Sequence, residues 1–212
     1  MKKLISILTA MMLLFTFAAA EQADNSDKNG FNAVVDSVTV AFDANATTGY
    51  QWTAFVVGGN SVMIDEENSG YVSDANPNLL DGVGGTHYFV IKALQPGESI
   101  IRFVYSRGWE EGIADETYLL VTVGEDALID VRDVTTDGVY GGVVVEVNEA
   151  EHSVLISTNR VGDVVVRFDE NETLPAEGES ILVYTNGTMT MSLPPIVNAI
   201  GWSSVAGDMA RE

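Results

Sequence analysis

Apolar and polar residues alternate in short runs along most of this 212-residue chain, and turn-forming residues separate the runs. In the run from Asp36 to Phe42, Val38, Val40 and Phe42 fall on one face, because successive side chains of a strand point to opposite faces of its sheet. The segment Thr117–Val123 is dense in β-branched and aromatic residues, which favour strands. The sequence therefore predicts an all-β protein.

The runs divide into two groups. About seven short strands within residues 31–124 predict an immunoglobulin-like β-sandwich. The acidic segment 125–137 follows and is predicted to be a linker. Five further short strands within residues 138–203 predict a small OB-like β-barrel. Its last part, Thr188–Ile196, resembles the ending of small secreted β-barrel modules, and we attach no function to it.

The first twenty residues have the pattern of an export signal. Lys2 and Lys3 precede an apolar run from Leu4 to Phe17, and three alanines end at Ala20. This order predicts a signal peptide over residues 1–20, cleaved near Ala20, and a soluble protein that is secreted or held in the cell envelope. The chain has no Cys, which excludes disulfides, a lipid-modified Cys anchor and thiol catalysis.

The chain is strongly acidic. It carries 31 Asp and Glu residues and a formal charge of −21, which becomes −23 if Lys2 and Lys3 are removed with the signal. Such a charge repels nucleic acid and anionic membranes, so neither is an expected partner. A well-solvated secreted surface explains the acidity best; attraction to a basic partner and adaptation to salt are the alternatives.

Motifs of enzymes and cofactor sites are missing from the sequence. The two histidines, His87 and His152, have no metal-binding spacing, and no Gly-x-Ser-x-Gly element occurs. Gly82–Gly85 lacks the Lys and the helix of a nucleotide loop, and the acidic turn that begins at Asp65 has Asn76 where a calcium loop needs Glu. We therefore expect a protein without catalytic residues, metal or cofactor, although a Ser–His–Asp group assembled only in space stays open.

Three turn-rich segments border hydrophobic strands: Asn45–Trp52, Gly82–Phe89 and Tyr105–Glu110. Asn45 favours a turn because its side chain can bond backbone groups two residues on, and Gly49 can adopt a positive φ. With the strands numbered in order, these segments become the second-to-third, fourth-to-fifth and sixth-to-seventh connections. Alternate connections emerge at one end of such a sandwich, so we expect the three loops to lie side by side.

Together the three loops resemble those of the chagasin-type inhibitors of papain-like cysteine proteases, over roughly residues 36–123. The first loop of that family reads Asn-Pro-Thr-Thr-Gly, then an aromatic residue and, two residues later, Trp. The matching residues here are Asn45, Thr47, Thr48, Gly49, Tyr50 and Trp52. The second loop, Gly-x-Gly-Gly, is matched by Gly82, Gly84 and Gly85. The third, Arg-Pro-Trp-Glu after a Tyr, is matched by Tyr105, Arg107, Trp109 and Glu110.

The resemblance implies an inhibitor whose first loop covers the active site of a papain-like protease while the other two loops grip the enzyme on either side. With the predicted signal peptide we expect this inhibitor to be secreted, and we expect it to be a monomer. The implied protease-binding residues are Asn45, Ala46, Thr47, Thr48, Gly49, Gly82, Val83, Gly84, Gly85, Arg107, Gly108 and Trp109. Tyr50 and Trp52 are expected to support the loop from the core. The protease could belong to a host, to a competitor or to the producing organism itself.

Two positions depart from the family pattern, since Ala46 and Gly108 replace prolines. Without each Pro the loop backbone is freer, and the ordering that the Pro would supply is worth about 0.4–1 kcal/mol. The two replacements together therefore predict inhibition that is weaker by roughly tenfold. The acidic flanks Asp43, Asp81, Glu110 and Glu111 disfavour proteases with acidic clefts. An alternative function is a secreted surface-binding or adhesion module. Trp109 and Trp202 could offer pieces of an aromatic platform for it, but they lie in different modules.

Overall fold

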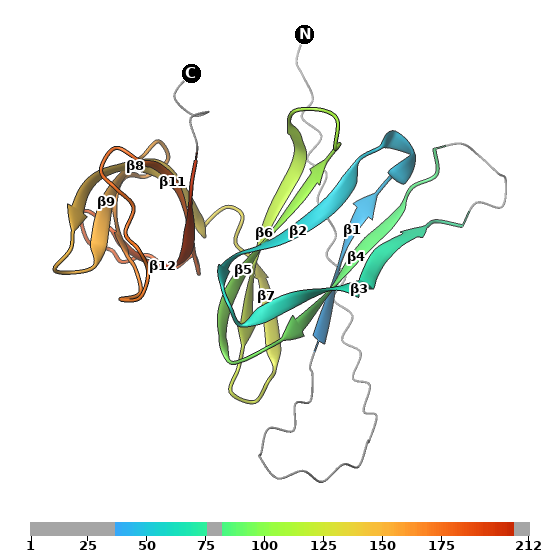
Figure 1. The fold of residues 1–212 in the computed structure, drawn as a ribbon, viewed down its shortest axis with the longest axis horizontal. Helices are drawn as coiled ribbons and strands as arrows, with labels where there is room; N and C mark the ends of the chain where they lie inside the picture. The colour runs from blue at the N-terminus through green and yellow to red at the C-terminus, as the bar shows by residue number, and fades with distance from the viewer. Residues whose placement is uncertain (1–36, 76–81, 206–212) are drawn as a thin grey trace.

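The computed structural model describes residues 37–75 and 82–205, which form strands almost throughout (Figure 1). The predicted signal peptide, residues 1–20, lies outside this range, as do residues 31–36 of the predicted sandwich. The strands of the sandwich are β1 (Ser37–Ala44), β2 (Gln51–Gly59), β3 (Val62–Ser73), β4 (Gly85–Ala93), β5 (Gly97–Ser106), β6 (Ile113–Val123) and β7 (Ile129–Asp133). The strands of the barrel are β8 (Val139–Asn148), β9 (Ser153–Thr158), β10 (Gly162–Arg167), β11 (Ser180–Thr185) and β12 (Ile196–Ser204).

The first seven strands form two antiparallel sheets that pack face to face. One sheet has the order β1-β4-β3 and the other β2-β5-β6-β7. Alternate residues of each strand enter the core between the sheets, as Val38, Val40 and Phe42 do from β1. The predicted immunoglobulin-like sandwich is confirmed, and its core is closed by buried aromatic and β-branched side chains.

The connections β1–β2, β3–β4 and β5–β6 all leave the same end of the sandwich, which is the upper end in Figure 1. They do so because successive strands run in opposite directions, so every second connection returns to one end. Counted from Ser37, where the described residues begin, these are the first, third and fifth connections rather than the second, fourth and sixth.

Strand β3 is continuous through the acidic turn that begins at Asp65. Its pairing with β4 shifts between Asp65 and Gly70, so the polar residues between them form a bulge. Ser69 Oγ donates to Asp65 O at 2.6 Å and accepts from Val90 N at 2.9 Å. Lys92 Nζ lies 2.5 Å from Asp65 Oδ2 and, by hydrogen bonding to it, lowers the pKa of that carboxyl. The acidic turn is therefore satisfied within the sheet.

The segment 125–137, predicted as a linker, contains strand β7, which pairs with β6 from Leu119 to Val123. Ile129 and Val131 turn toward the sandwich core, while Asp130 and Asp133 are exposed. Val134, directly after the strand, is fully buried. The segment connects the two modules as an integral edge of the sandwich, and its acidity reflects the exposed face of an edge strand.

The remaining five strands form a closed barrel in the order β10-β12-β11-β8-β9. Strand β10 pairs with β12 in parallel, and the other neighbours are antiparallel. Apolar side chains such as Val144, Ile156 and Ile181 fill the interior. The predicted small barrel is confirmed, with β12 as its fifth strand.

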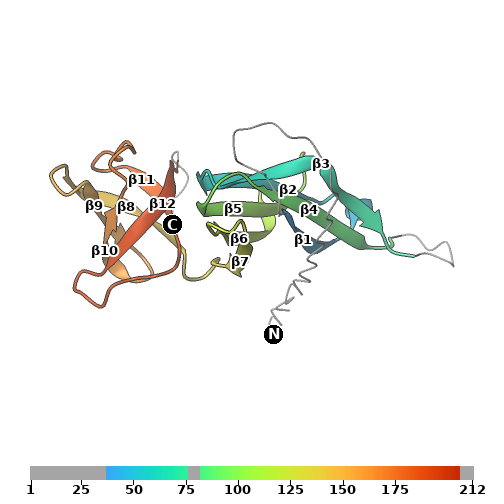
Figure 2. The ribbon, with the colours of Figure 1, turned by 90° about the horizontal axis from the view of Figure 1, so that it is seen from below.

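The barrel packs against part of the outer face of the sheet β2-β5-β6-β7, at the end away from the three loops (Figure 2). Ile100, Tyr118 and Leu120 point away from the sandwich core and pack in a cluster that includes Val134 and Tyr184. The rings of Tyr118 and Tyr184 stack with their centroids 5.8 Å apart, and burial raises the pKa of Tyr118. The sandwich and the barrel are therefore joined by a buried apolar interface, which we call the junction cluster.

At the edge of this interface two glycine backbones pass very closely. A Cβ built at Gly201 would lie 2.6 Å from the Cα of Gly58. Gly58 of β2 and Gly201 of β12 can approach in this way only because both lack side chains.

Among the described residues, no helix is long and apolar enough to cross a bilayer.

Candidate functional site

The first loop is a single turn of 3-10 helix, Ala46–Thr48, capped at both ends. At its start the side-chain oxygen of Asn45 accepts from the backbone N of Thr47 at 3.1 Å and from its hydroxyl at 2.6 Å. At its end Gly49, with φ of 80°, donates to Ala46 O at 3.1 Å. The hydroxyl of Thr48 bonds Asn45 O at 2.6 Å. The turn is therefore fixed by its own side chains.

The tip of this loop is open to solvent and carries no charge. Ala46, Thr47 and Thr48 are all exposed, whereas Asn45 and Gly49 are half-buried. The loop thus presents a small, stiff and neutral projection, with methyl and hydroxyl groups at its surface. Such a shape is suited to insertion into a narrow cleft, since little conformational entropy remains to be lost on binding.

A stack of aromatic rings supports the loop from below. Tyr50 stacks on Tyr105 with centroids 5.2 Å apart, Tyr105 stacks on Trp52 at 5.0 Å, and Trp52 stacks on Phe42 at 4.5 Å. Trp52 is only 5% exposed and donates its indole N–H to Asp43 O at 3.0 Å. As predicted, Trp52 lies in the core, and the stack links the loop to that core.

The second loop is described from Gly82 onward, and the predicted flank Asp81 lies outside the described residues. Asn45 Nδ2 donates to Gly82 O at 3.0 Å, which joins the second loop to the first. Gly82 has φ of 79°, in the region that favours glycine. A Cβ at Gly85 would lie 2.3 Å from Val72 O, so the pairing of β3 with β4 requires glycine there. Gly85 is buried and acts as a support, while Gly82 is exposed.

The third loop contacts the first through two side chains. The guanidinium carbon of Arg107 lies 4.2 Å from the centre of the Tyr50 ring, and Arg107 Nη1 is 2.7 Å from Glu110 Oε1. The indole of Trp109 lies over Gly49, where an added Cβ would come within 2.2 Å of its Cη2. Trp109 is nevertheless 71% exposed, in agreement with the prediction of a loop position.

Eleven of the twelve residues predicted to bind a protease thus belong to loops at one end of the sandwich, and the twelfth, Gly85, is the buried first residue of β4. Contacts join the first loop to each of the others. The sequence did not reveal two of these links, the packing of Arg107 on Tyr50 and of Trp109 on Gly49. It also missed the bond from Asn45 N to the hydroxyl of Tyr105, which is 3.0 Å long. Tyr105 matched the resemblance, but only the fold shows what its hydroxyl does.

The charge of the loop face is slightly negative. Arg107 is the one basic residue in segments 45–50, 82–84 and 107–112, and its ion pair with Glu110 neutralises it. Glu110 and Glu111 are exposed, as is Asp43 at the end of β1. Next to the second loop, His87 stacks on Phe89 with centroids 4.5 Å apart, and burial lowers the pKa of His87. Burial therefore favours the neutral form of His87.

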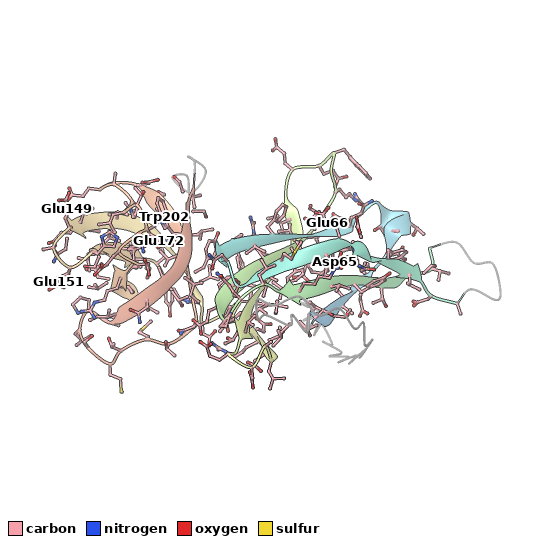
Figure 3. The ribbon with its side chains drawn as sticks, turned by 60° about the horizontal axis from the view of Figure 1, so that its bottom comes forward. Asp65, Glu66, Glu149, Glu151, Glu172 and Trp202 are labelled. Atoms are coloured by element: carbon pink, nitrogen blue, oxygen red, sulfur yellow. The ribbon has the colours of Figure 1, made fainter. Side chains whose placement is uncertain are left out.

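Other polar features lie away from the loops. Asp65 and Glu66 lie on the sandwich, whereas Glu172 and Trp202 belong to the barrel (Figure 3). Glu172 and Trp202 line a shallow cleft against β2, and burial raises the pKa of Glu172. Within residues 37–75 and 82–205, no three His, Asp or Glu side chains are grouped in a way that could hold a metal ion.

Comparisons with known proteins relate the sandwich region to one family. Residues 33–123 match the family model of the chagasin family peptidase inhibitors I42. A crystal structure of the cysteine protease inhibitor EhICP2 from Entamoeba histolytica is similar at 21% sequence identity and a TM-score of 0.36. The alignment with it covers 42% of this chain and 78% of that chain. A search of curated proteins found no match.

Proposed function

Residues 33–123 form a chagasin-family domain, and from this premise we propose that the protein inhibits papain-like cysteine proteases by placing its three loops across the active-site cleft. The observation that carries the proposal is the joint geometry of the loops. Their neutral, exposed tip at Ala46–Thr48 is fixed by capping bonds and stands between two further loops at the same end of the sandwich.

In the proposed complex the first loop occupies the catalytic centre. Thr47 and Thr48 would lie over the catalytic Cys and His of the protease and exclude water and substrate. The loop itself would resist cleavage, because the 3-10 turn holds its peptide bonds in a curled form. Extending it for attack would break the Thr48 N and Gly49 N bonds to Asn45 O and Ala46 O, both 3.1 Å long.

The flanking loops would provide area and orientation. Backbone at Gly82 and Val83 can lie close to a protein wall because little side chain stands in front of it. The large exposed face of Trp109 offers the kind of anchor on which interfaces depend most. The acidic residues Glu110 and Glu111 favour a protease whose rim is neutral or basic at that point.

The proposal includes action outside the cytoplasm. If residues 1–20 are removed as the sequence predicts, the mature chain begins near Glu21 and meets proteases in the cell envelope or the medium. We propose that it binds its target as a monomer, one inhibitor for each enzyme. The source of the target protease, whether foreign or the producer's own, is not specified by these loops.

The test is a titration of papain with the mature protein, compared with the double variant Thr47→Asp, Thr48→Asp. Two carboxylates forced into the desolvated cleft should weaken inhibition by at least about 100-fold, because an unpaired buried charge costs about 3–5 kcal/mol. The matched control is Thr136→Asp, Thr173→Asp, which adds the same charge at exposed barrel-side positions. Saturable inhibition by the natural protein and the control, lost in the loop variant, is the expected result.

Circular dichroism and thermal melting of all three proteins separate a loop effect from unfolding. Failure of the folded natural protein to inhibit papain, cathepsin L or another papain-like protease at micromolar concentration would contradict the proposal. The surface-binding function would then be the remaining account of the loop geometry of this sandwich.

A further inference from the structure

Arg107 lies where an inhibitor would be expected to offer a charge to its target, yet its own chain already occupies its groups. One face of the guanidinium lies on the Tyr50 ring at 4.2 Å, and Nη1 is paired with Glu110 at 2.7 Å. Its Nε is buried and has no hydrogen-bond partner among the described residues. With a face and an edge in use, the guanidinium is poorly placed for a two-bond contact with a carboxylate of another protein.

Tyr50 connects Arg107 to the core through aromatic stacking. It is the outermost ring of the stack that continues through Tyr105 and Trp52 to the core. Tyr105 also fixes the beginning of the first loop, since its hydroxyl accepts from Asn45 N. Arg107 therefore packs on Tyr50, the last residue of the first loop. Tyr105, in the same stack, bonds Asn45, the first residue of that loop.

Trp109 reaches the first loop independently of Arg107. Its indole covers Gly49, the left-handed residue that ends the 3-10 turn. Any side chain at position 49 would collide with this ring as well as strain the backbone. Loop three thus touches both Gly49 and Tyr50, the last two residues of loop one.

These contacts stand beside the two positions where the resemblance leads one to expect prolines. At Gly108 an added Cβ would meet no atom within 4 Å, so packing restrains this residue little. Ala46 begins the turn, and its N is not a donor in any bond of the turn. The contacts from the third loop to Gly49 and Tyr50 thus restrain the first loop, in which the resemblance leads one to expect a Pro at position 46.

We propose that Arg107 is a positioning residue, which orders the first loop through Tyr50 and Glu110 instead of binding the protease directly. This inference rests on the proposed function, because it assigns how the inhibitory loop is held. It separates Arg107 from Trp109, whose exposed face remains available to a target. It also predicts that a restraint added to loop one can replace Arg107.

The experiment combines Arg107→Ala with Ala46→Pro in a double-mutant cycle on the full mature protein. Pro is suited to position 46 because it is the first residue of the turn and Asn45 before it is extended, with φ −137° and ψ 93°. We expect Arg107→Ala to weaken papain inhibition by about tenfold, which is the size of effect expected when one cation–π contact and one ion pair are lost. Ala46→Pro should then restore most of the loss, and should improve the natural protein by much less.

Hydrogen exchange of the free inhibitor gives a readout that needs no protease. The amides of Thr48 and Gly49, which bond Asn45 O and Ala46 O, should exchange at least about fivefold faster in Arg107→Ala and return toward the natural rate with Ala46→Pro. Arg107→Lys should resemble Arg107→Ala, because an ammonium group cannot lie flat on the ring. Arg167→Ala, at an exposed barrel position, is the control and should change neither measurement.

Two results would overturn the inference. One is unchanged exchange at Thr48 and Gly49 in Arg107→Ala, and the other is an equal gain from Ala46→Pro in both backgrounds, which marks Arg107 as a direct contact. If the natural protein inhibits no protease, the proposed function fails. The exchange rates still decide, by themselves, whether Arg107 orders the loop.

Discussion

At the scale of single residues, the glycines at the loop end of the sandwich differ in whether the fold leaves room for a side chain. Gly85 and Gly108 both belong to the predicted binding set, but their surroundings differ completely. A Cβ at Gly85 would lie 2.3 Å from Val72 O and 2.4 Å from the hydroxyl of Tyr71, whereas one at Gly108 would meet nothing. Glycine at 85 is required by the fold, and glycine at 108 is not required by packing.

This contrast gives a matched pair of substitutions. Gly85→Ala should lower the free energy of unfolding by about 1–3 kcal/mol, because the methyl group must displace the backbone of β3. Gly108→Ala should stay within about 0.5 kcal/mol of the natural protein. Urea denaturation of both variants measures the difference. Equal stabilities would show that β3 and β4 are not paired at Gly85 as described.

Glu172 allows a prediction about pH. Its Oε2 is buried without a hydrogen-bond partner among the described residues, and burial raises the pKa of this carboxyl above its usual value of 4.5. A raised pKa in the folded state means that folding favours the protonated form. The stabilisation that comes from this protonation is fully present below the ordinary pKa of a Glu carboxyl, and it is lost as the pH rises through the higher pKa of the folded state.

Glu172→Gln should therefore raise the melting temperature at pH 7, where ionisation of the buried natural carboxyl destabilises the folded state. Near pH 4, where that carboxyl is protonated, the variant should have no such advantage. Glu170→Gln, an exposed neighbour, serves as the control and should show no such pH dependence. Thermal melts of the three proteins between pH 4 and pH 8 test this. A stabilisation that is the same at both ends of the range would contradict a raised pKa.

At the scale of elements, the strands were predictable from the sequence because each exposes one face and buries the other. Val38, Val40 and Phe42 alternate with smaller or polar residues, so β1 was predicted correctly. Strand β7 was not, because its acidic residues resemble those of a linker, and only its pairing with β6 shows that Ile129 and Val131 face a core.

The loop face was predictable in part. Which residues are loop residues follows from turn chemistry, and their common end follows from the order of antiparallel strands. The contacts between loops do not, because the stack of Tyr50, Tyr105 and Trp52 depends on the register of β2 against β5. No local pattern specifies a register shared by strands about fifty residues apart.

The first loop itself gives a prediction about an element. Ala46→Pro should raise the free energy of unfolding by about 0.4–1 kcal/mol, since it restrains the unfolded chain at a position whose folded backbone accepts Pro. The control is Thr47→Pro, which should destabilise because Thr47 N donates to the Asn45 side chain. Chemical denaturation of both variants measures the signs. A loss of stability with Ala46→Pro would mean that the turn differs from the one described.

At the scale of the whole molecule, the junction cluster packs the sandwich against the barrel, and we expect the two modules to unfold together. Consecutive apolar residues such as Ile100-Ile101 and Leu119-Leu120-Val121 are the sequence signal for it, because a strand buried on both faces loses its alternation. Ile101, Leu119 and Val121 fill the sandwich core, while Ile100 and Leu120 meet the barrel.

The isolated segment 31–124 should accordingly aggregate or bind a hydrophobic dye, whereas the mature chain should unfold in one calorimetric transition. The double change Ile100→Thr, Leu120→Thr should have opposite effects in the two contexts. It should improve the solubility of the segment and destabilise the full chain by more than about 2 kcal/mol. A soluble, cooperatively folded natural segment would show that the barrel is dispensable for the sandwich.

The measurement that tests the central claim most directly is the rate at which iodoacetamide alkylates the catalytic cysteine of papain in the presence of the mature protein. The proposed complex places Thr47 and Thr48 over that cysteine. Alkylation should therefore slow in proportion to the fraction of enzyme bound, and the Thr47→Asp, Thr48→Asp variant should give no protection. Alkylation at the free-enzyme rate, with binding shown independently by calorimetry, would mean that the loops dock elsewhere and leave the active site open.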